Sequence, residues 1–318
     1  MPLLPIQLEP EKIGSIEKQT FTNEDGMITA ISYRNDEGLM IVFDNCNSTQ
    51  YTNTVREQKF NGMLLNVYIL GSSYRKSDSF IGERLAGCAN IARPWTSFGD
   101  LQCSCKHILS ISIITLMNDF KLSYHEDYTD VIIQTLLDRY SDSNIQLKMS
   151  DLSMAYCYAL FKLQYVSNMD CDEQLVKELV TGLLLDLYSN EQQQIISESH
   201  EDHTIADSIF ADLLSTPMVI NRDGFEEIYK KYGINKYKAI RLFKDRYGET
   251  PYLYFKRTRL QMAAALILTG DSNMMEVASR IGYASESKFA IAFKKQFGVR
   301  PKHFLAHIKE SYNNIKIE

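Results

Sequence analysis

The sequence has 318 residues, of which 45% are apolar and 23% are charged, a composition typical of a globular protein large enough for two domains. It contains no apolar run of the ~18 residues that a membrane-spanning helix needs. Its first residues also lack the basic and apolar regions of a signal peptide, so we expect a cytoplasmic protein with no membrane partner. Six cysteines are too few for a disulfide scaffold, and we interpret most of them as small buried side chains.

The formal net charge of −6 is unevenly distributed along the chain. Residues 225–312 contain 17 basic and 8 acidic side chains, a charge of +9, which leaves −15 for the rest of the chain. A basic segment joined to an acidic one indicates that the basic segment contacts a polyanion. Two solvated surfaces of opposite sign are the alternative.

Four short apolar runs in the N-terminal part of the chain predict β-strands. They are rich in Ile, Val and Tyr and are bounded by turn residues such as Asn-Gly, which is typical of an antiparallel sheet or a small barrel. The predicted strands cover residues 26–33, 38–44, 62–71 and 107–117.

The hydrophobic period then changes to that of helices, over residues 127–142 and 172–190. In the second of these, apolar residues recur at alternating three- and four-residue steps, a seam suited to packing against another helix. We interpret Leu175, Leu179, Leu183 and Leu187 as the contact of a homodimer, with packing on the sheet of the same domain as the alternative. Residues 191–203 carry few apolar side chains and are interpreted as a linker.

The rest of the chain is predicted to be helical and contains a doubled unit. The segment FKDRYGETP at residues 243–251 is matched by FKKQFGVRP at residues 293–301, fifty positions later. Asn235 and Ser285 are also fifty apart, and both are good N-cap residues that follow a short helix and a glycine-containing turn. Each copy therefore has the pattern of a helix-turn-helix motif.

A long helix is predicted between the two copies. Thr250 can cap its start with Pro251 at the first helical position, and Gly270 follows its last periodic residue. The helix would be about 28 Å long. The second helix of each motif would then lie about one turn of DNA, ~34 Å, from that of the other motif. One chain could therefore contact two successive major grooves.

Helical periodicity assigns an inward and an outward face to the second helix of each motif. The inward faces carry Ala239, Leu242, Phe243 and Arg246 in the first copy, and Phe289, Ala292 and Phe293 in the second. The outward faces carry cationic, tyrosine and serine side chains that can donate to phosphate oxygens or base edges in a major groove. A solvated face is the alternative for any single position.

These residues carry a resemblance to a known family. The runs IRLFKDRYGETPYLYFKRTRLQMAAALI and EVASRIGYASESKFAIAFKKQFGVRP closely resemble the DNA-binding domain of AraC/XylS-type transcriptional regulators, over about residues 205–308. The resemblance implies two helix-turn-helix motifs joined by a long helix, double-stranded promoter DNA and RNA polymerase as partners, and a role in controlling transcription initiation.

The outward faces and the resemblance together predict the residues that contact DNA. They are Asn235, Lys236, Tyr237, Lys238, Ile240, Arg241 and Lys244 in the first motif, and Ser285, Glu286, Ser287, Lys288, Ile291, Lys294 and Lys295 in the second. The chain departs from the family pattern at Ala239, where Leu is usual, and at Ile291, where a polar or basic residue is frequent. Ile291 can meet a thymine methyl group but cannot hydrogen-bond, and Glu286 would repel phosphate unless it accepts from a cytosine amino group.

For the N-terminal part, the resemblance implies a sensor domain for a small-molecule effector, with a cupin-like β-barrel followed by dimerisation helices. The expected fold class is therefore α+β, with an effector-sensing and dimerisation domain at 1–190, a linker at 191–203 and an all-α DNA-binding domain at 204–318. Six aromatic side chains could line an apolar effector pocket or fill a core: Tyr33, Tyr51, Tyr68, Tyr74, Trp95 and Phe98.

An alternative function is metal or redox sensing. On a strand, Cys103, Cys105 and His107 would point to the same side, as a soft metal such as zinc or copper(I) requires. A closed zinc site needs a fourth ligand, and Cys-x-x-Cys spacing is absent, so ordinary packing is favoured and no metal or cofactor is expected. The sequence contains no Gly-x-Ser-x-Gly, glycine-rich phosphate loop or His-Glu-x-x-His motif, so we do not expect an enzyme.

Overall fold

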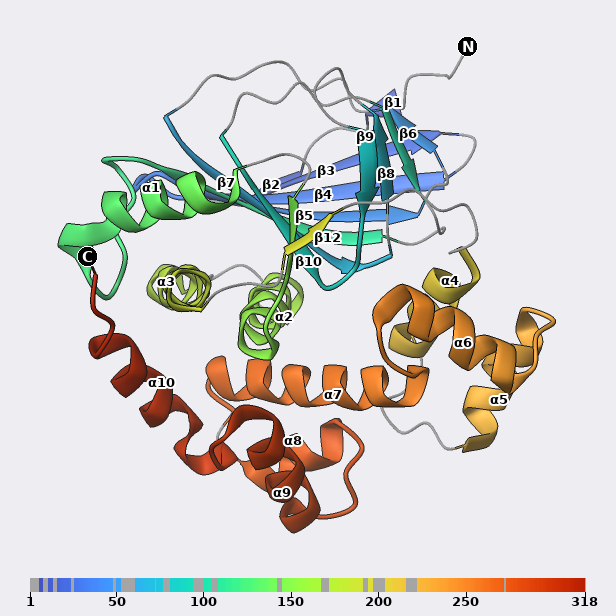
Figure 1. Cartoon of the computed structure of the whole chain (residues 1–318). Helices are drawn as coiled ribbons and strands as arrows, with labels where there is room; N and C mark the ends of the chain where they lie inside the picture. The colour runs from blue at the N-terminus through green and yellow to red at the C-terminus, as the bar shows by residue number, and fades with distance from the viewer. Residues whose placement is uncertain are drawn as a thin grey trace. The chain divides into compact units, whose positions relative to one another are not determined.

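The structure of the chain is a computed structural model. It describes residues 6–7, 11–13, 16–23, 26–47, 50–52, 61–71, 73–76, 81–93, 100–103, 108–141, 145–166, 172–190, 194–196, 204–215, 222–271 and 273–317. The chain divides into two compact units, which are shown together in Figure 1 and are described separately below. The N-terminal unit comprises Met1–Met149, Ser167–His200 and Ile317–Glu318, and the helical unit comprises Ser150–Val166 and Glu201–Lys316.

The N-terminal unit is built on antiparallel β-sheet. A ten-stranded sheet has the order β1-β3-β4-β5-β12-β7-β10-β13-β14, with β2 paired to β3, and a second sheet has the order β6-β11-β8-β9. The strands of the first sheet are β1 (Ile6–Gln7), β2 (Glu11–Ile13), β3 (Ile16–Asn23), β4 (Gly26–Arg34), β5 (Leu39–Asn47), β7 (Gly62–Leu70), β10 (Cys88–Ala92), β12 (Ile108–Leu116), β13 (Ile145–Lys148) and β14 (Gln194–Ile196). Those of the second are β6 (Gln50–Thr52), β8 (Ser73–Lys76), β9 (Ile81–Arg84) and β11 (Asp100–Cys103).

The four strands predicted from the sequence, β4, β5, β7 and β12, form adjacent positions of the large sheet and are confirmed. Their alternate apolar residues supply much of the core, including Ile41, Leu65 and Ile113, which are almost completely buried. Among the described strands the pairing does not join β1 to β14, so the cupin-like barrel implied by the resemblance is not confirmed.

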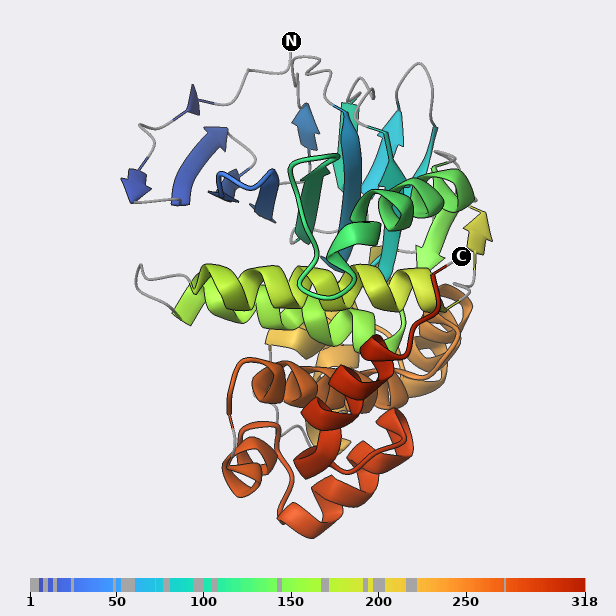
Figure 2. The same cartoon turned by 90° about the vertical axis from the view of Figure 1, so that its left-hand side faces the viewer.

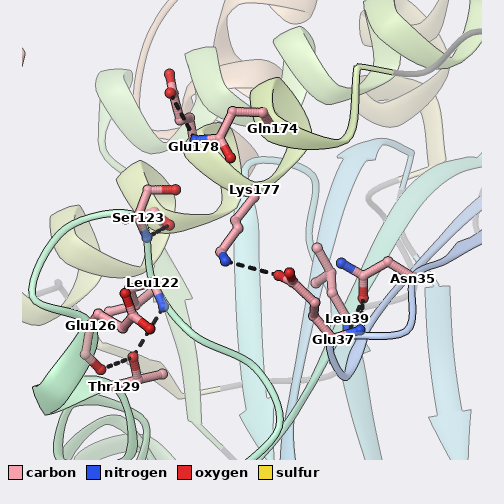
Figure 3. A network of polar contacts seen from close by, with 11 residues as sticks. Asn35, Glu37, Leu39, Leu122, Ser123, Glu126, Thr129, Gln174, Lys177 and Glu178 are labelled. Carbon is pink, nitrogen blue, oxygen red and sulfur yellow. Dashed lines mark hydrogen bonds and ion pairs between the residues drawn. The ribbon is translucent and has the colours of Figure 1, made fainter.

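Two helices of this unit match the predicted helical segments: α1 (Thr129–Tyr140) and α3 (Glu173–Ser189). Helix α1 packs against β7, β10 and α3, and it lies toward the viewer in Figure 2. Figure 3 shows the polar contacts that hold α3 to the loops of its own unit. The Lys177 ammonium lies 2.8 Å from the Glu37 carboxylate, and the Ser123 amide donates to the Thr181 hydroxyl at 2.9 Å.

The predicted dimer seam lies on α3. Leu179, Leu183 and Leu187 are buried within the single chain, whereas Leu175 is only half-buried. The three buried leucines favour the alternative interpretation, in which the seam packs inside the chain. The homodimer contact stays a prediction.

The helical unit contains both predicted helix-turn-helix motifs and the long helix between them. Its helices are α2 (Asp151–Val166), α4 (Thr204–Ser215), α5 (Arg222–Lys231), α6 (Lys236–Tyr247), α7 (Pro251–Leu268), α8 (Met274–Arg280), α9 (Glu286–Phe297) and α10 (Phe304–Asn313). Helices α5 and α6 form the first motif, and α8 and α9 form the second. Helix α2 was not predicted, and it is grouped with these helices although its sequence lies between β13 and α3.

Two features concern the predicted domain boundaries. Within the predicted linker, β14 pairs with β13, and residues 150–166 of the predicted sensor domain belong to the helical unit. The boundaries at 190 and 204 stay predictions. In the described part of the chain, no helix is both long and apolar enough to cross a membrane. Cys46, Cys88 and Cys157 are buried there, as interpreted from the sequence.

Candidate nucleic-acid interface

The second helices of the two motifs, α6 and α9, begin and end in the same way. The Asn235 side chain accepts from the Lys238 amide at 2.9 Å, and the Ser285 side chain accepts from the Lys288 amide at 3.4 Å. These N-caps satisfy amides that the first turn of a helix leaves without a partner. Gly248 and Gly298 end the helices with φ angles of 76° and 77°, a left-handed conformation that glycine adopts without a steric cost. The two helices therefore have identical bounds, displaced by fifty residues.

The inward faces of α6 and α9 are aromatic, as predicted. Phe243 and Phe293 are fully buried. The Phe243 ring lies 5.6 Å from the Tyr254 ring, and the Phe293 ring lies 5.1 Å from the Phe304 ring, in edge-on arrangements favoured by aromatic pairs. Because Tyr254 and Phe304 are also fifty residues apart, each second helix is anchored by an equivalent pair of rings.

The outward face of α6 is exposed and cationic. Tyr237 is 84% exposed and is the most exposed of the large apolar side chains in the described part of the chain. Lys236, Lys238, Arg241 and Lys244 are exposed around it, whereas Ile240 is half-buried. A helix that fits a major groove can bring such side chains to base edges and phosphates.

The outward face of α9 combines apolar and cationic side chains. Ile291 is 73% exposed, and Ser287, Lys288, Lys294 and Lys295 are also exposed. The Glu286 carboxylate lies 3.2 Å from the Lys302 ammonium, so its charge is balanced inside the protein. A groove of about 660 Å³ lies beside α9, and its lining combines apolar and basic side chains with Glu286 and Ser287: Met274, Glu286, Ser287, Ala290, Ile291, Lys294, Lys295, Arg300, Pro301 and Lys302.

The first motif is held by a buried ion pair that the sequence did not reveal. The Arg246 guanidinium, on the inward side of α6 as predicted, makes two hydrogen bonds of 3.0 Å to the Asp207 carboxylate of α4. The Arg246 side chain is 3% exposed and that of Asp207 is 0% exposed. The Tyr247 hydroxyl also donates to Asp207, and burial, with the nearby Asp207 carboxylate, raises the pKa of Tyr247 well above its ordinary value.

Helix α7 joins the two motifs. The Thr250 side chain accepts from the Leu253 amide and Pro251 occupies the first turn, which confirms the predicted start. Its 18 residues give a length of about 27 Å. Gly270 follows its C-cap with a φ angle of 96°, as expected for a residue that stops the helix. The long helix predicted from the sequence is therefore confirmed.

The predicted metal-site residues and most of the predicted pocket residues cannot be compared with the structure. Cys105, His107, Trp95 and Phe98 lie outside the described residues, and for Cys103, Tyr51 and Tyr74 only the backbone is described. The metal-sensing alternative therefore stays a prediction. Of the predicted pocket residues with described side chains, Tyr33 and Tyr68 are buried among the core of the sheet. The described residues contain no cluster of three or more His, Cys, Asp or Glu that could hold a metal ion.

Comparisons with known proteins agree with this geometry. Residues 228–307 match the family model described as a helix-turn-helix domain. The transcriptional regulator AlkR of Acinetobacter baylyi is 38% identical over 71 residues, which are 22% of this chain and 23% of AlkR. The probable transcription factor PqrA of Proteus vulgaris is 33% identical over 79 residues, which are 25% of this chain and 65% of PqrA. The likeness to AlkR thus spans about a quarter of that regulator.

Among solved structures, ToxT of Vibrio cholerae is similar over 86% of this chain and 98% of its own, with 15% identity and a TM-score of 0.32. A score of this size does not establish a shared overall fold.

The buried ion pair leads to a stability prediction. Replacement of Asp207 by Ala leaves the Arg246 guanidinium buried without its carboxylate, which we expect to lower the free energy of unfolding by about 3 to 5 kcal/mol. Urea denaturation followed by circular dichroism measures the loss. The matched control is Glu286→Ala, because the exposed Glu286–Lys302 pair should contribute less than about 1 kcal/mol. Equal losses in the two variants would show that the Asp207–Arg246 pair is not a buried structural contact.

Proposed function

We propose that this chain, whose C-terminal part is a helix-turn-helix domain of the AraC/XylS type, is a sequence-specific DNA-binding regulator of transcription. The observation that carries the proposal is the matched pair α6 and α9. Both helices are capped, anchored by aromatic rings and exposed along the face that holds the predicted DNA contacts. They lie in the segment with a charge of +9, which favours contact with a polyanion.

The dimensions of the unit support a particular way of binding. A major groove admits one α-helix, and successive major grooves on one side of a duplex repeat about every 34 Å. The bridging helix α7 is about 27 Å long, slightly less than this repeat. One chain would therefore place α6 and α9 in neighbouring major grooves, and the DNA would bend toward the protein to close the difference.

The two helices that we propose to enter the major grooves, α6 and α9, are called the readers below. They differ in the side chains that they present to the DNA. On α6, Arg241 can donate two hydrogen bonds to a guanine, with lysines around it for phosphates. On α9, Ile291 offers an apolar contact, and the nearby lysines again suit phosphates. We propose that the first motif reads sequence by hydrogen bonds and that the second depends more on thymine methyl groups.

The remaining parts of the proposal rest on the family resemblance. The N-terminal unit would bind a small-molecule effector, the chain would form a homodimer through α3, and RNA polymerase would be its partner at promoters. Such a regulator would act in the cytoplasm, where promoter DNA is found.

Selection from a pool of random duplexes tests the proposed function. We expect one enriched sequence with two blocks about ten base pairs apart, and an affinity that falls steeply with salt because lysines and arginines displace counterions from phosphates. Equal weak affinity for every duplex, with no enriched sequence, would refute the proposal.

Arg241→Ala should weaken binding to the selected site by about 1 to 3 kcal/mol, because a buried bidentate contact to one base is lost. Preference at that base should relax, while the other block keeps its sequence requirement. Fluorescence anisotropy on single-base variants of the site measures both effects. Lys309→Ala is the control: it removes the same charge from an exposed position of α10, away from α6 and α9, and should cost much less.

Thymine in the block read by α9 should be recognised through its methyl group. Replacing those thymines by deoxyuridine removes only the methyl, and we expect a loss of about 1 kcal/mol for the wild type and almost none for Ile291→Ala. The same replacement in the α6 block serves as the control. If Ile291→Ala and the wild type lose the same affinity, Ile291 does not meet the methyl group.

A further inference from the structure

Helix α2 occupies an unusual position in the chain. It belongs to the helical unit, yet the segments on both sides of it belong to the N-terminal unit. Strand β13 ends at Lys148, just before α2 begins at Asp151, and α3 begins at Glu173, soon after α2 ends at Val166. Helix α2 packs mainly against the bridging helix α7, and Figure 1 shows the two helices next to each other.

The N-terminal end of α2 is tied to α7 and, through it, to the end of the first reader. The Asp151 carboxylate accepts from the Gln261 amide at 2.7 Å and lies 3.3 Å from the Arg257 guanidinium. Arg257 also donates to the Glu249 carboxylate at 2.6 and 2.8 Å. Glu249 directly follows Gly248, the residue that ends α6. Asp151 and Glu249 thus share one guanidinium.

The C-terminal half of α2 is tied to the other end of α7 and to the second motif. The Lys162 ammonium donates to the Thr269 hydroxyl at 2.7 Å and to the Asp271 carboxylate at 2.9 Å. Asp271 accepts in turn from Arg280 of α8 at 3.1 Å. The Lys162 side chain is only 20% exposed, so this contact is partly shielded from water.

Both helices also carry buried apolar side chains. Ala155, Leu160 and Phe161 of α2 are buried, as are Ala263 and Ala264 of α7. Small side chains on α7 allow the helices to approach closely, and buried apolar area supplies the stabilisation.

A further hydrogen bond joins α2 to the last helix. The hydroxyl groups of Tyr156 and of Tyr312 on α10 lie 2.9 Å apart. Helix α2 also contacts the second reader, α9. Helix α2 therefore contacts the bridge α7, the second helix of the second motif, α9, and the last helix, α10.

We propose that α2 is a positioning element of the DNA-binding unit, a splint that fixes α6 and α9 relative to each other along α7. The proposal rests on the proposed function in so far as α6 and α9 read DNA. Two motifs joined only by α7 can each shift on their end of that helix. A splint tied to Glu249 at one end and to Arg280 at the other restricts such shifts.

The position of α2 in the chain gives this element a second role. Both of its ends continue into the N-terminal unit, so a change in that unit that moves or releases α2 acts directly on the spacing of the readers. A ligand has such an effect only if it binds more tightly in one placement of α2 than in the other. The same contacts thus provide the path by which an effector would change DNA binding.

Lys162→Met in the full chain tests the splint. It keeps the aliphatic stem but removes both hydrogen bonds, while Lys177→Met removes an ion pair of similar length and equal lysine exposure in the N-terminal unit. The selected duplex is compared with one that carries an extra base pair between its two blocks, which turns one block by about a tenth of a turn. We expect the wild type and Lys177→Met to bind the longer duplex more weakly than the selected one. In Lys162→Met the ratio of the two affinities should be about fivefold smaller.

Hydrogen exchange without DNA provides a readout that does not depend on the proposed function. In Lys162→Met, amides of residues 249–271 should exchange several-fold faster than in the wild type, and in Lys177→Met they should not. If Lys162→Met does not fold, the milder Asp151→Asn, which keeps the side-chain shape, is used in both experiments.

The outcomes separate the two proposals. Unchanged exchange over residues 249–271, or unchanged discrimination between the two duplexes in a folded variant, overturns the splint. Absence of any selected sequence for the wild type overturns the proposed function, and the exchange experiment then still decides whether α2 restrains α7.

Discussion

The separation of α6 and α9 by the helix α7, which has a fixed length of 18 residues, is the constraint on which the proposed DNA-binding mode depends. Helix α7 begins at a Thr cap with Pro251 in its first turn and ends before Gly270, so both of its ends are set by local chemistry. A helix of about 27 Å has few internal degrees of freedom. The remaining freedom of α6 and α9 then lies in how each motif packs on its end of α7, and α2 and the buried polar contacts restrict this packing.

The second helices of the two motifs are held by different polar contacts at equivalent positions. Arg246 in α6 bonds to Asp207, whereas Gln296, fifty residues later in α9, donates to the backbone carbonyl of Arg257 at 3.1 Å. Asp207 and Arg257 are themselves fifty residues apart. Arg257 contacts Gln296 of α9 through its backbone carbonyl, and its guanidinium therefore binds Glu249 and Asp151 instead. The divergence of the repeat thus supplies the side chain that holds α2.

Much of the helical unit could be predicted because its signals are local. The caps Asn235 and Ser285, the fifty-residue repeat and the inward Phe243 and Phe293 each depend on residues close in sequence. The partner of Arg246 could not be predicted in this way, since Asp207 lies 39 residues earlier. Helix α2 was missed because its sequence, DLSMAYCYALFKLQYV, is apolar around most of its circumference and shows no clear helical period.

The N-terminal unit shows the same distinction. The long strands β4, β5, β7 and β12 follow from local alternation and turn residues, but sheet order depends on contacts between distant segments. The leucine periodicity of α3 correctly indicated a helix with a buried face. Periodicity alone could not decide which surface covers that face, because a seam for a second chain and one for the same chain have the same pattern.

The central claim is that one chain holds two readers for successive major grooves on one side of the duplex. A hydroxyl-radical footprint of the selected duplex, taken at a measured stoichiometry, tests it most directly. We predict two protected windows about one helical turn apart, on the same face of the DNA, at one chain per duplex. A single window at that stoichiometry, with the second appearing only when two chains are bound, would contradict the account.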